Sequence, residues 1–138
     1  MKDVNDPCIF CKHIVKHRDF VAENHLAYAE RDSYPVTEGH VLVMPKRHVK
    51  TFFELTSPEM TAIQRLINLM QHQLLNEDNT IEGFNIGVNN GEVAGQSVFH
   101  VHFHLIPRRK GDVEWNPKGG VRHVMGNDKA YYNLKDED

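Results

Sequence analysis

Apolar and polar residues alternate through residues 96–106, and the polar positions include His100, His102 and His104. Residues at i, i+2 and i+4 lie on one face of a strand. The pattern therefore predicts a half-buried strand that exposes a row of three imidazoles. Its other face is apolar and is expected to pack on a core: Phe99, Val101, Phe103 and Leu105.

Shorter apolar segments predict the other strands of a sheet. Residues 21–23 and 26–30 are typical of a hairpin with its turn at Asn24 and His25. The apolar run 41–44, ended by Pro45, indicates a buried central strand. A further strand is expected over 84–89.

One long helix is predicted from about Thr56 to Leu75. Thr56 and Glu59 have the spacing of a capping box, and an apolar stripe follows at helical spacing. A short helical turn is expected from Pro7 to about His13. Together these elements predict an α+β domain with an antiparallel sheet over residues 1–110. Residues 111–138 are rich in glycine and charge and are interpreted as an extended tail that packs on the domain or on a partner subunit.

The length and net charge of the chain limit its possible functions. A chain of 138 residues is one domain by size, and its formal net charge of −3 argues against a nucleic acid polymer as partner. No apolar run reaches membrane-spanning length, and residues 1–6 have no apolar signal segment, so we expect a cytoplasmic protein that does not bind membranes. Ten histidines are the one unusual count.

Cys8 and Cys11 form a Cys-x-x-Cys motif and are the only cysteines. A structural disulfide is not expected in a cytoplasmic chain. Three interpretations stay open: a redox pair, half of a zinc site that needs two further ligands, and two buried cysteines without a ligand.

Geometry limits what the three histidines do. Neighbouring imidazoles on a strand are roughly 6.6 Å apart and the outer two about 13 Å, so three in a line cannot easily converge on one metal. Separate roles are favoured, with one imidazole as nucleophile or base and its neighbours orienting it. The preceding segment 91–97 combines glycines with Gln96 and Ser97, which fits an anion cradle. An imidazole nucleophile beside an anion cradle indicates phosphoryl or nucleotidyl transfer. Exposed histidines on a solvated strand are the alternative without function.

These motifs resemble those of the histidine-triad (HIT) nucleotide-binding proteins. Residues 100–106 match the family's His-φ-His-φ-His-φ-φ signature, where φ is apolar. Residues 39–48 are similar to its Gly-His-φ-φ-φ-φ-Pro-Lys-x-His segment, residues 8–11 to the opening of its bacterial zinc-binding members, and residues 89–91 with 95–97 to its phosphate loop. The resemblance extends from about Cys8 to Arg109.

The resemblance implies a HIT-like fold whose sheet is extended across a homodimer. It implies a hydrolase that releases a nucleoside 5′-monophosphate, purine preferred, from phosphoramidate, acyl or phosphate leaving groups without a metal in the chemistry. His102 would be the nucleophile that forms a nucleotidyl-histidine, His104 would contact the phosphate and the leaving side, and His40 would support His102 through a hydrogen-bonded relay. The implied substrate contacts are Asn89, Gln96 and Ser97 for the phosphate, Asp32 for the ribose, and Ile9 and Phe10 for the base.

The same resemblance implies a structural Zn²⁺ held by Cys8, Cys11, His48 and His100. Glu30 and His13 depart from the family, which often has an aromatic and an apolar residue there, so a more polar base pocket is expected. Residues 107–112 are similar to the diadenosine polyphosphate hydrolase branch, and Gly-Gln-Ser-Val with the N-terminal half to the phosphoramidase branch. A phosphoramidase is the first hypothesis. A dinucleoside polyphosphate hydrolase and a non-catalytic nucleotide-binding zinc protein are the alternatives.

Overall fold

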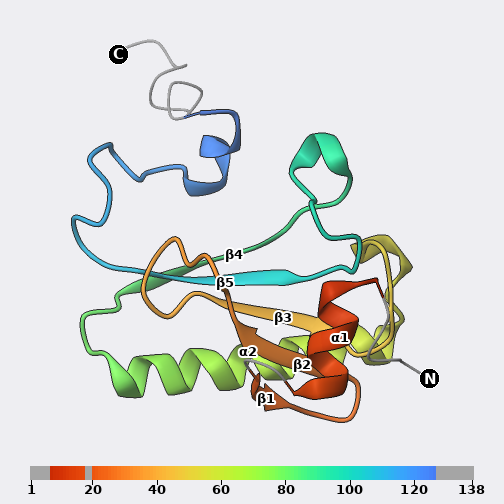
Figure 1. Cartoon of the computed structure of the whole chain (residues 1–138). Helices are drawn as coiled ribbons and strands as arrows, with labels where there is room; N and C mark the ends of the chain where they lie inside the picture. Colours follow the sequence, from red (N-terminus) through yellow and green to blue (C-terminus); the bar gives the residue numbers. More distant parts are fainter. Residues whose placement is uncertain (1–6, 18–19, 127–138) are drawn as a thin grey trace.

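The computed structural model describes residues 7–17 and 20–126, and they form a five-stranded sheet with helices on both faces (Figure 1). The strand order is β1-β2-β3-β5-β4, and every neighbouring pair is antiparallel. The strands are β1 (Phe20–Glu23), β2 (Ala27–Arg31), β3 (Val41–Pro45), β4 (Gly83–Val88) and β5 (Phe103–Arg108). The predicted α+β class and antiparallel sheet are confirmed.

Helix α2 (Ser57–Glu77) covers one face of the sheet. It begins as predicted, because the Thr56 side chain accepts from the Glu59 N–H and the Glu59 carboxylate accepts from the Thr56 N–H. Its buried stripe packs on inward-facing residues of the central strands, and this contact forms the main core: Ala62, Ile63, Leu66, Met70 and Leu74 with Val41, Val43, Phe103 and Leu105.

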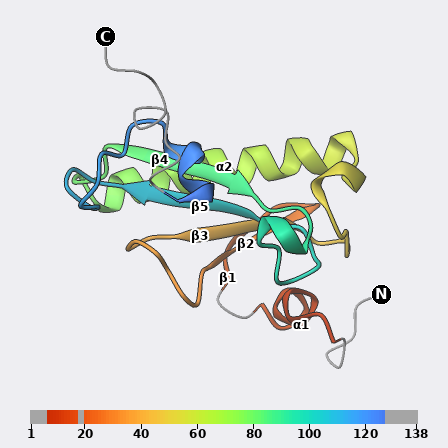
Figure 2. The ribbon, with the colours of Figure 1, turned by 90° about the horizontal axis from the view of Figure 1, so that it is seen from above.

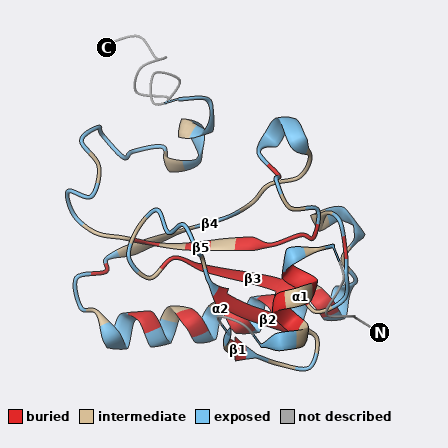
Figure 3. Ribbon diagram, in the orientation of Figure 1, coloured by how far each residue is buried: buried red, intermediate tan, exposed pale blue. Residues whose placement is uncertain are grey.

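Helix α1 (Ile9–Lys16) lies on the opposite face from α2 (Figure 2). Phe10 and Ile14 from this helix pack on Tyr28, Leu42 and Met44 of the sheet, which gives a second, smaller core. Burial is concentrated where the two helices meet the central strands (Figure 3). Because α1 covers only part of its face, the even-numbered residues of β5 remain half-buried rather than covered.

The predicted strand through all three histidines is wrong at its start. Strand β5 begins at Phe103, and the segment before it turns toward residues 48–50, where the Val101 N–H donates to the Val49 carbonyl. The expected exposed row of imidazoles is also wrong, because His100 is 0% and His102 is 8% exposed. Both side chains are therefore buried in the protein and do not lie on a solvated face of the sheet.

The segment after β5 folds back over the sheet and ends in the short 3-10 helix η3 (Gly120–Met125) (Figure 1). Residues 127–138 of the predicted tail lie outside the described residues, and the division at residue 110 remains a prediction. Among the described helices, none has both the length and the apolar character of a membrane span.

Candidate functional site

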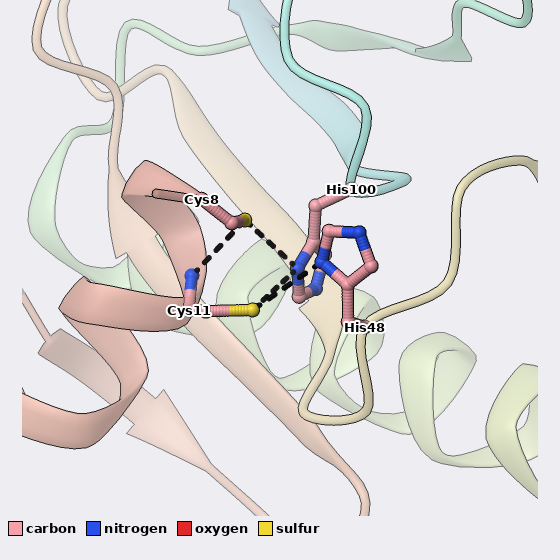
Figure 4. A group of neighbouring side chains, drawn as sticks. All are labelled: Cys8, Cys11, His48 and His100. Atoms are coloured by element: carbon pink, nitrogen blue, oxygen red, sulfur yellow. Dashed lines mark hydrogen bonds between the residues drawn. The ribbon is translucent and has the colours of Figure 1, made fainter. Parts of the chain in front are cut away.

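Four side chains from three distant parts of the sequence form one cluster (Figure 4). Cys8 caps α1 and Cys11 lies in its first turn, while His48 follows β3 and His100 precedes β5. The His100 Nδ1 atom is 3.5 Å from the Cys8 Sγ and 3.4 Å from the Cys11 Sγ, and the Cys11 Sγ is 3.4 Å from the His48 Nδ1. The four predicted metal-ligating residues are therefore brought together.

The donor atoms of this cluster fit a tetrahedral zinc ion. Zn–S bonds of about 2.3 Å and Zn–N bonds of about 2.1 Å at a tetrahedral angle place sulfur and nitrogen about 3.6 Å apart, close to the observed separations. The His100 Nε2–H donates to the Pro45 carbonyl oxygen at 2.8 Å, which leaves the Nδ1 lone pair toward the sulfurs. The interpretation of Cys-x-x-Cys as half of a zinc site is thus favoured over the redox and unligated alternatives.

The backbone carbonyl of His100 orients the side chain of His102. Its Nδ1–H donates to the His100 carbonyl oxygen at 2.9 Å, so its Nε2 carries the lone pair. The Phe10 ring packs edge-on against the imidazole, with the centroids 4.8 Å apart. Burial lowers the pKa of His102, although the bond to His100 and the charge of Asp32 oppose the shift. The arrangement fixes the tautomer that a nucleophile needs.

His40 contacts His104, and not His102 as predicted. The Val36 N–H donates to the His40 Nδ1 at 3.2 Å, so the proton of His40 is on Nε2. That Nε2 is 2.9 Å from the His104 Nδ1 and 3.3 Å from an Asp32 carboxylate oxygen. It follows that His104 presents an Nε2–H donor.

Burial lowers the pKa of both imidazoles in this pair. The pKa of His104 falls to about 4, first through burial and then through the nearby His102 and His40. Burial also lowers the pKa of His40, and Asp32 partly offsets it. Asp32, His40 and His104 lie close enough to suit a metal ion. Yet the Val36 N–H requires a proton on the inward-facing Nε2 of His40, so a hydrogen-bonded relay fits better.

The glycine loop before the histidines is held together by Gln96. The side-chain oxygen of Gln96 accepts from the Gly91 N–H, and its amide donates to the carbonyls of Lys50 and Val98. The amide hydrogens of Gln96 are donated to the backbone, so the residue shapes the loop, and its predicted contact with phosphate stays a prediction. Gly91 and Gly95 have φ of +95° and +98°, which side chains rarely adopt.

Ser97 is exposed and Asn89 is half-buried on this loop, and their predicted contacts with phosphate remain predictions. Sequence reasoning missed Asn90, whose side-chain oxygen accepts from the Phe52 N–H at 2.8 Å and ties the loop to the turn after β3. Nothing in the local pattern distinguishes Asn90 from Asn89, because the partner is 38 residues away.

The residues predicted for the base pocket lie at the N-terminal end of the site. Phe10 is buried against His102, while Ile9 is 42% exposed. His13 and Glu30, the two departures from the family, are both buried, and the His13 Nδ1 atom lies 3.0 Å from a Glu30 carboxylate oxygen. The polar groups of His13 and Glu30 therefore face each other, so the base pocket is expected to be less polar than the sequence indicated.

Two arginines in the segment that is similar to the polyphosphate hydrolase branch, Arg108 and Arg109, form ion pairs with carboxylates. Arg108 forms a two-pronged contact with Asp112, and Arg109 contacts Asp78 at 2.8 Å. The pKa of both aspartates is lowered to about 2, that of Asp78 by the Thr80 hydroxyl and then by Arg109, and that of Asp112 by Arg108. Paired cations are poorly placed to hold an added phosphate chain.

Comparisons with known proteins identify the family. The HIT domain family matches residues 14–111. The adenosine 5′-monophosphoramidase HNT1 of Candida albicans is 39% identical over 108 residues, which cover 74% of this chain and 70% of that protein. The adenylylsulfatase HINT3 of Arabidopsis thaliana is 31% identical over 128 residues, which cover 91% and 64%. The chain belongs to the HIT family.

Solved structures agree with this assignment. A HIT family protein from Bacillus anthracis is 36% identical with a TM-score of 0.72, over 94% of this chain and 90% of that one. A Zn-bound histidine triad family protein from Mycobacterium smegmatis is 29% identical with a TM-score of 0.70, over 77% and 78%. The predicted HIT-like fold is thereby confirmed for the single chain.

Proposed function

We propose that this protein is a nucleotidyl hydrolase that releases a nucleoside 5′-monophosphate, purine preferred, from an amine. The observation that carries the proposal is the His102 Nδ1–H bond to the His100 carbonyl, which leaves the Nε2 lone pair available as the nucleophile. The names of the relatives from Candida albicans and Arabidopsis thaliana support the hydrolase class.

In the first step the His102 Nε2 lone pair forms a bond to the α-phosphorus. The phosphorus–nitrogen bond of the substrate breaks, and its electron pair goes to the amine nitrogen, which takes up a proton passed on by His104. His40 keeps the His104 Nε2–H directed outward by donating to its Nδ1. In the second step water forms an oxygen–phosphorus bond, the bond to His102 breaks with its electron pair returning to Nε2, and the proton that water loses restores His104.

The nucleotide is proposed to lie between the glycine loop and α1. Ser97 and Asn89 would donate to the phosphate oxygens, while Ile9 and Phe10 would contact the base. Asp32 would accept from the ribose hydroxyls. Its Oδ1 accepts from the Tyr34 N–H at 2.8 Å, which holds the carboxylate in place at the edge of the site.

A structural zinc ion on Cys8, Cys11, His48 and His100 completes the proposal. When bound, this ion would join α1 to the segment that leads into His102, so that the nucleophile and the base-contacting residues keep a fixed separation. The Zn-bound structural relative supports this assignment.

A homodimer with a continuous sheet is also proposed, with β4 as the joining strand. β4 is an edge of the sheet, and its Ile86 side chain is half exposed. Sedimentation analysis of wild type and an Ile86→Lys variant tests this: a dimer that the variant converts to monomer supports it, and a monomeric wild type contradicts it.

A substrate panel tests the proposed activity. Purified protein should turn over adenosine 5′-phosphoramidate faster than a dinucleoside tetraphosphate, because Arg108 and Arg109 are paired with carboxylates. Faster turnover of the tetraphosphate would favour the polyphosphate hydrolase alternative. Nucleotide binding without turnover of either would favour the non-catalytic alternative.

A further inference from the structure

The cluster of Cys8, Cys11, His48 and His100 is accessible from one side. Cys11 and His100 are each 0% exposed, whereas Cys8 is half-buried and His48 is exposed. A cavity of about 510 Å³ reaches the two accessible members, and we call it the thiol pocket. Its lining comes from the start of α1, the loop after β3 and the segment before β5: Pro7, Cys8, Ile9, His48, Ser97, Val98 and Phe99.

This access makes the two cysteines unequal. A zinc ion on the cluster would hold both thiols as thiolates. The thiolate is the form of cysteine that reacts with peroxides, and its reactivity depends on access from solvent. Cys8 has that access through the thiol pocket, while the buried Cys11 does not line it. A small oxidant therefore meets the Cys8 sulfur first.

The two sulfurs are placed to react with each other. The ligand atoms of the cluster all lie within 4.8 Å of one another, which is the upper limit for the separation of the two Sγ atoms. Cys8 caps α1, and the Cys11 N–H donates to the Cys8 Sγ at 3.3 Å. Both sulfurs point from α1 toward the same two imidazoles (Figure 4). An oxidised Cys8 sulfur thus has a second thiolate beside it, as in the Cys-x-x-Cys pairs that form redox disulfides.

We propose that Cys8 and Cys11 form an oxidation site, at which a hydroperoxide removes both thiolate ligands from the zinc cluster. The Cys8 thiolate forms a bond to one peroxide oxygen, the oxygen–oxygen bond breaks, and the departing oxygen takes up a proton. The Cys11 thiolate then forms a bond to the Cys8 sulfur, the sulfur–oxygen bond breaks, and the released hydroxide takes up a proton to become water. The sulfurs lose an electron pair and the peroxide gains it.

The disulfide would leave only His48 and His100 as ligands, so the cluster would no longer hold zinc. The redox chemistry of the Cys-x-x-Cys motif then acts on a zinc site and does not replace it. Neither the family match, which begins at residue 14, nor the name of the Zn-bound relative assigns such an oxidation site.

Two contacts connect this oxidation site with His102. The His100 carbonyl oxygen orients the His102 imidazole, and Phe10, which lies between the two cysteines in α1, packs 4.8 Å from that ring. Once the cluster no longer joins α1 to the segment before β5, neither contact is held in place. We therefore expect slower nucleotidyl transfer in the oxidised protein. This consequence rests on the proposed function, whereas the oxidation itself does not.

The test adds hydrogen peroxide to zinc-loaded wild type, without substrate, and follows zinc release with a colorimetric chelator. We expect the bound zinc to be released and peptide mass spectrometry to find a Cys8–Cys11 disulfide. Dithiothreitol with added zinc should restore both metal content and Tm. Cys8→His keeps four ligands but cannot form the disulfide, so it should bind zinc and retain it in peroxide. His72→Ala, at an exposed position on α2, should behave as wild type.

Zinc that is retained in peroxide, or that the chelator alone removes at the same rate, would overturn the inference. If Cys8→His binds no zinc, the order of oxidation in wild type decides. The Cys8–Cys11 disulfide should form before the sulfoxide of Met125, which is 73% exposed, and the reverse order would overturn the inference.

Turnover of adenosine 5′-phosphoramidate by the same samples is a separate measurement. Activity that falls on oxidation and returns on reduction supports the connection with His102, and full activity in the oxidised protein contradicts it. If even the reduced protein shows no turnover, the proposed function fails. Zinc release with disulfide formation would still support the oxidation site in that case.

Discussion

The Nε2 atom of His40 lies 2.9 Å from the Nδ1 atom of His104. Because the Val36 N–H occupies the other ring nitrogen of His40, the direction of this hydrogen bond is fixed from His40 to His104. The residue that orients His104, which we propose faces the leaving group, is therefore not the one that orients His102, the proposed nucleophile. His102 relies on the His100 carbonyl instead.

Replacing His40 should slow the step in which the leaving group departs. In His40→Phe the His104 ring loses its partner, and we expect kcat to fall on the order of a hundredfold while nucleotide monophosphate binding is unchanged. Single-turnover kinetics with a phenyl ester, whose leaving group needs no proton, supplies the control and should show a much smaller loss. Equal losses for both substrates would contradict a role through His104.

Metal content and stability should fall together when a cluster ligand is removed. His48→Ala removes one of four ligands, so we expect about one zinc per chain in wild type and little in the variant, with a lower Tm. His72, an exposed histidine on α2, provides the matched control: His72→Ala should retain both metal and Tm. Metal analysis and thermal unfolding make the measurement, and a metal-free wild type would refute the assignment.

The sequence predicted the elements well where a local pattern determined them. The Thr56–Glu59 capping box fixed the start of α2, and the hairpin and the central strand were placed within a residue or two. The predicted strand through the histidines was wrong at its start. Alternation shows which side chains share a polarity, but it does not show which backbone groups form hydrogen bonds with a neighbouring strand. Residues 100–101 bond to the 45–49 segment, a contact that local periodicity cannot show.

The residues that make up the site could be predicted from the sequence, but their hydrogen-bond partners could be predicted less well. Cys8, Cys11, His48 and His100 meet as the family resemblance implied. The partners of His40 and Gln96 depend on side-chain distances of a few ångströms between segments far apart in sequence, so local patterns cannot assign them. The His13–Glu30 pair shows the same limit, since each residue alone indicated a more polar pocket.

Acid should destabilise the protein through Glu59. Arg47 contacts both oxygens of the buried Glu59, and this contact, helped by Thr56, lowers the pKa of Glu59 from 4.5 to about 2. Because the folded-state pKa is depressed, the stabilisation is complete above about pH 4.5 and is lost as pH falls toward 2. We expect a loss of about 2 kcal/mol from this group by pH 3.

Denaturant unfolding at pH 7 and pH 3 measures this linkage. Glu59→Gln should be less stable at pH 7 and should lose less stability than wild type on acidification. Glu82→Gln changes an exposed glutamate and should behave as wild type. An unchanged pH dependence in Glu59→Gln would rule out this source of acid sensitivity.

We expect Gln96 to stabilise the glycine loop and Ser97 to bind the substrate. Gln96→Glu removes the donors to the Lys50 and Val98 carbonyls and buries a charge, so both Tm and kcat/KM should fall. Ser97 is exposed, so Ser97→Ala should raise KM with Tm unchanged. Thermal unfolding and steady-state kinetics on the two variants test this, and a normal Tm in Gln96→Glu would argue for direct phosphate contact.

The nucleotidyl-His102 intermediate is the central claim, and intact-protein mass spectrometry after rapid mixing with adenosine 5′-phosphoramidate at neutral pH tests it most directly. Wild type and His72→Ala should each show a transient mass increase equal to one adenylyl group, with the group located on His102 by peptide mapping. His102→Ala should show no adduct and no turnover while still binding adenosine monophosphate. An adduct on another residue, or turnover retained in His102→Ala, would contradict the account.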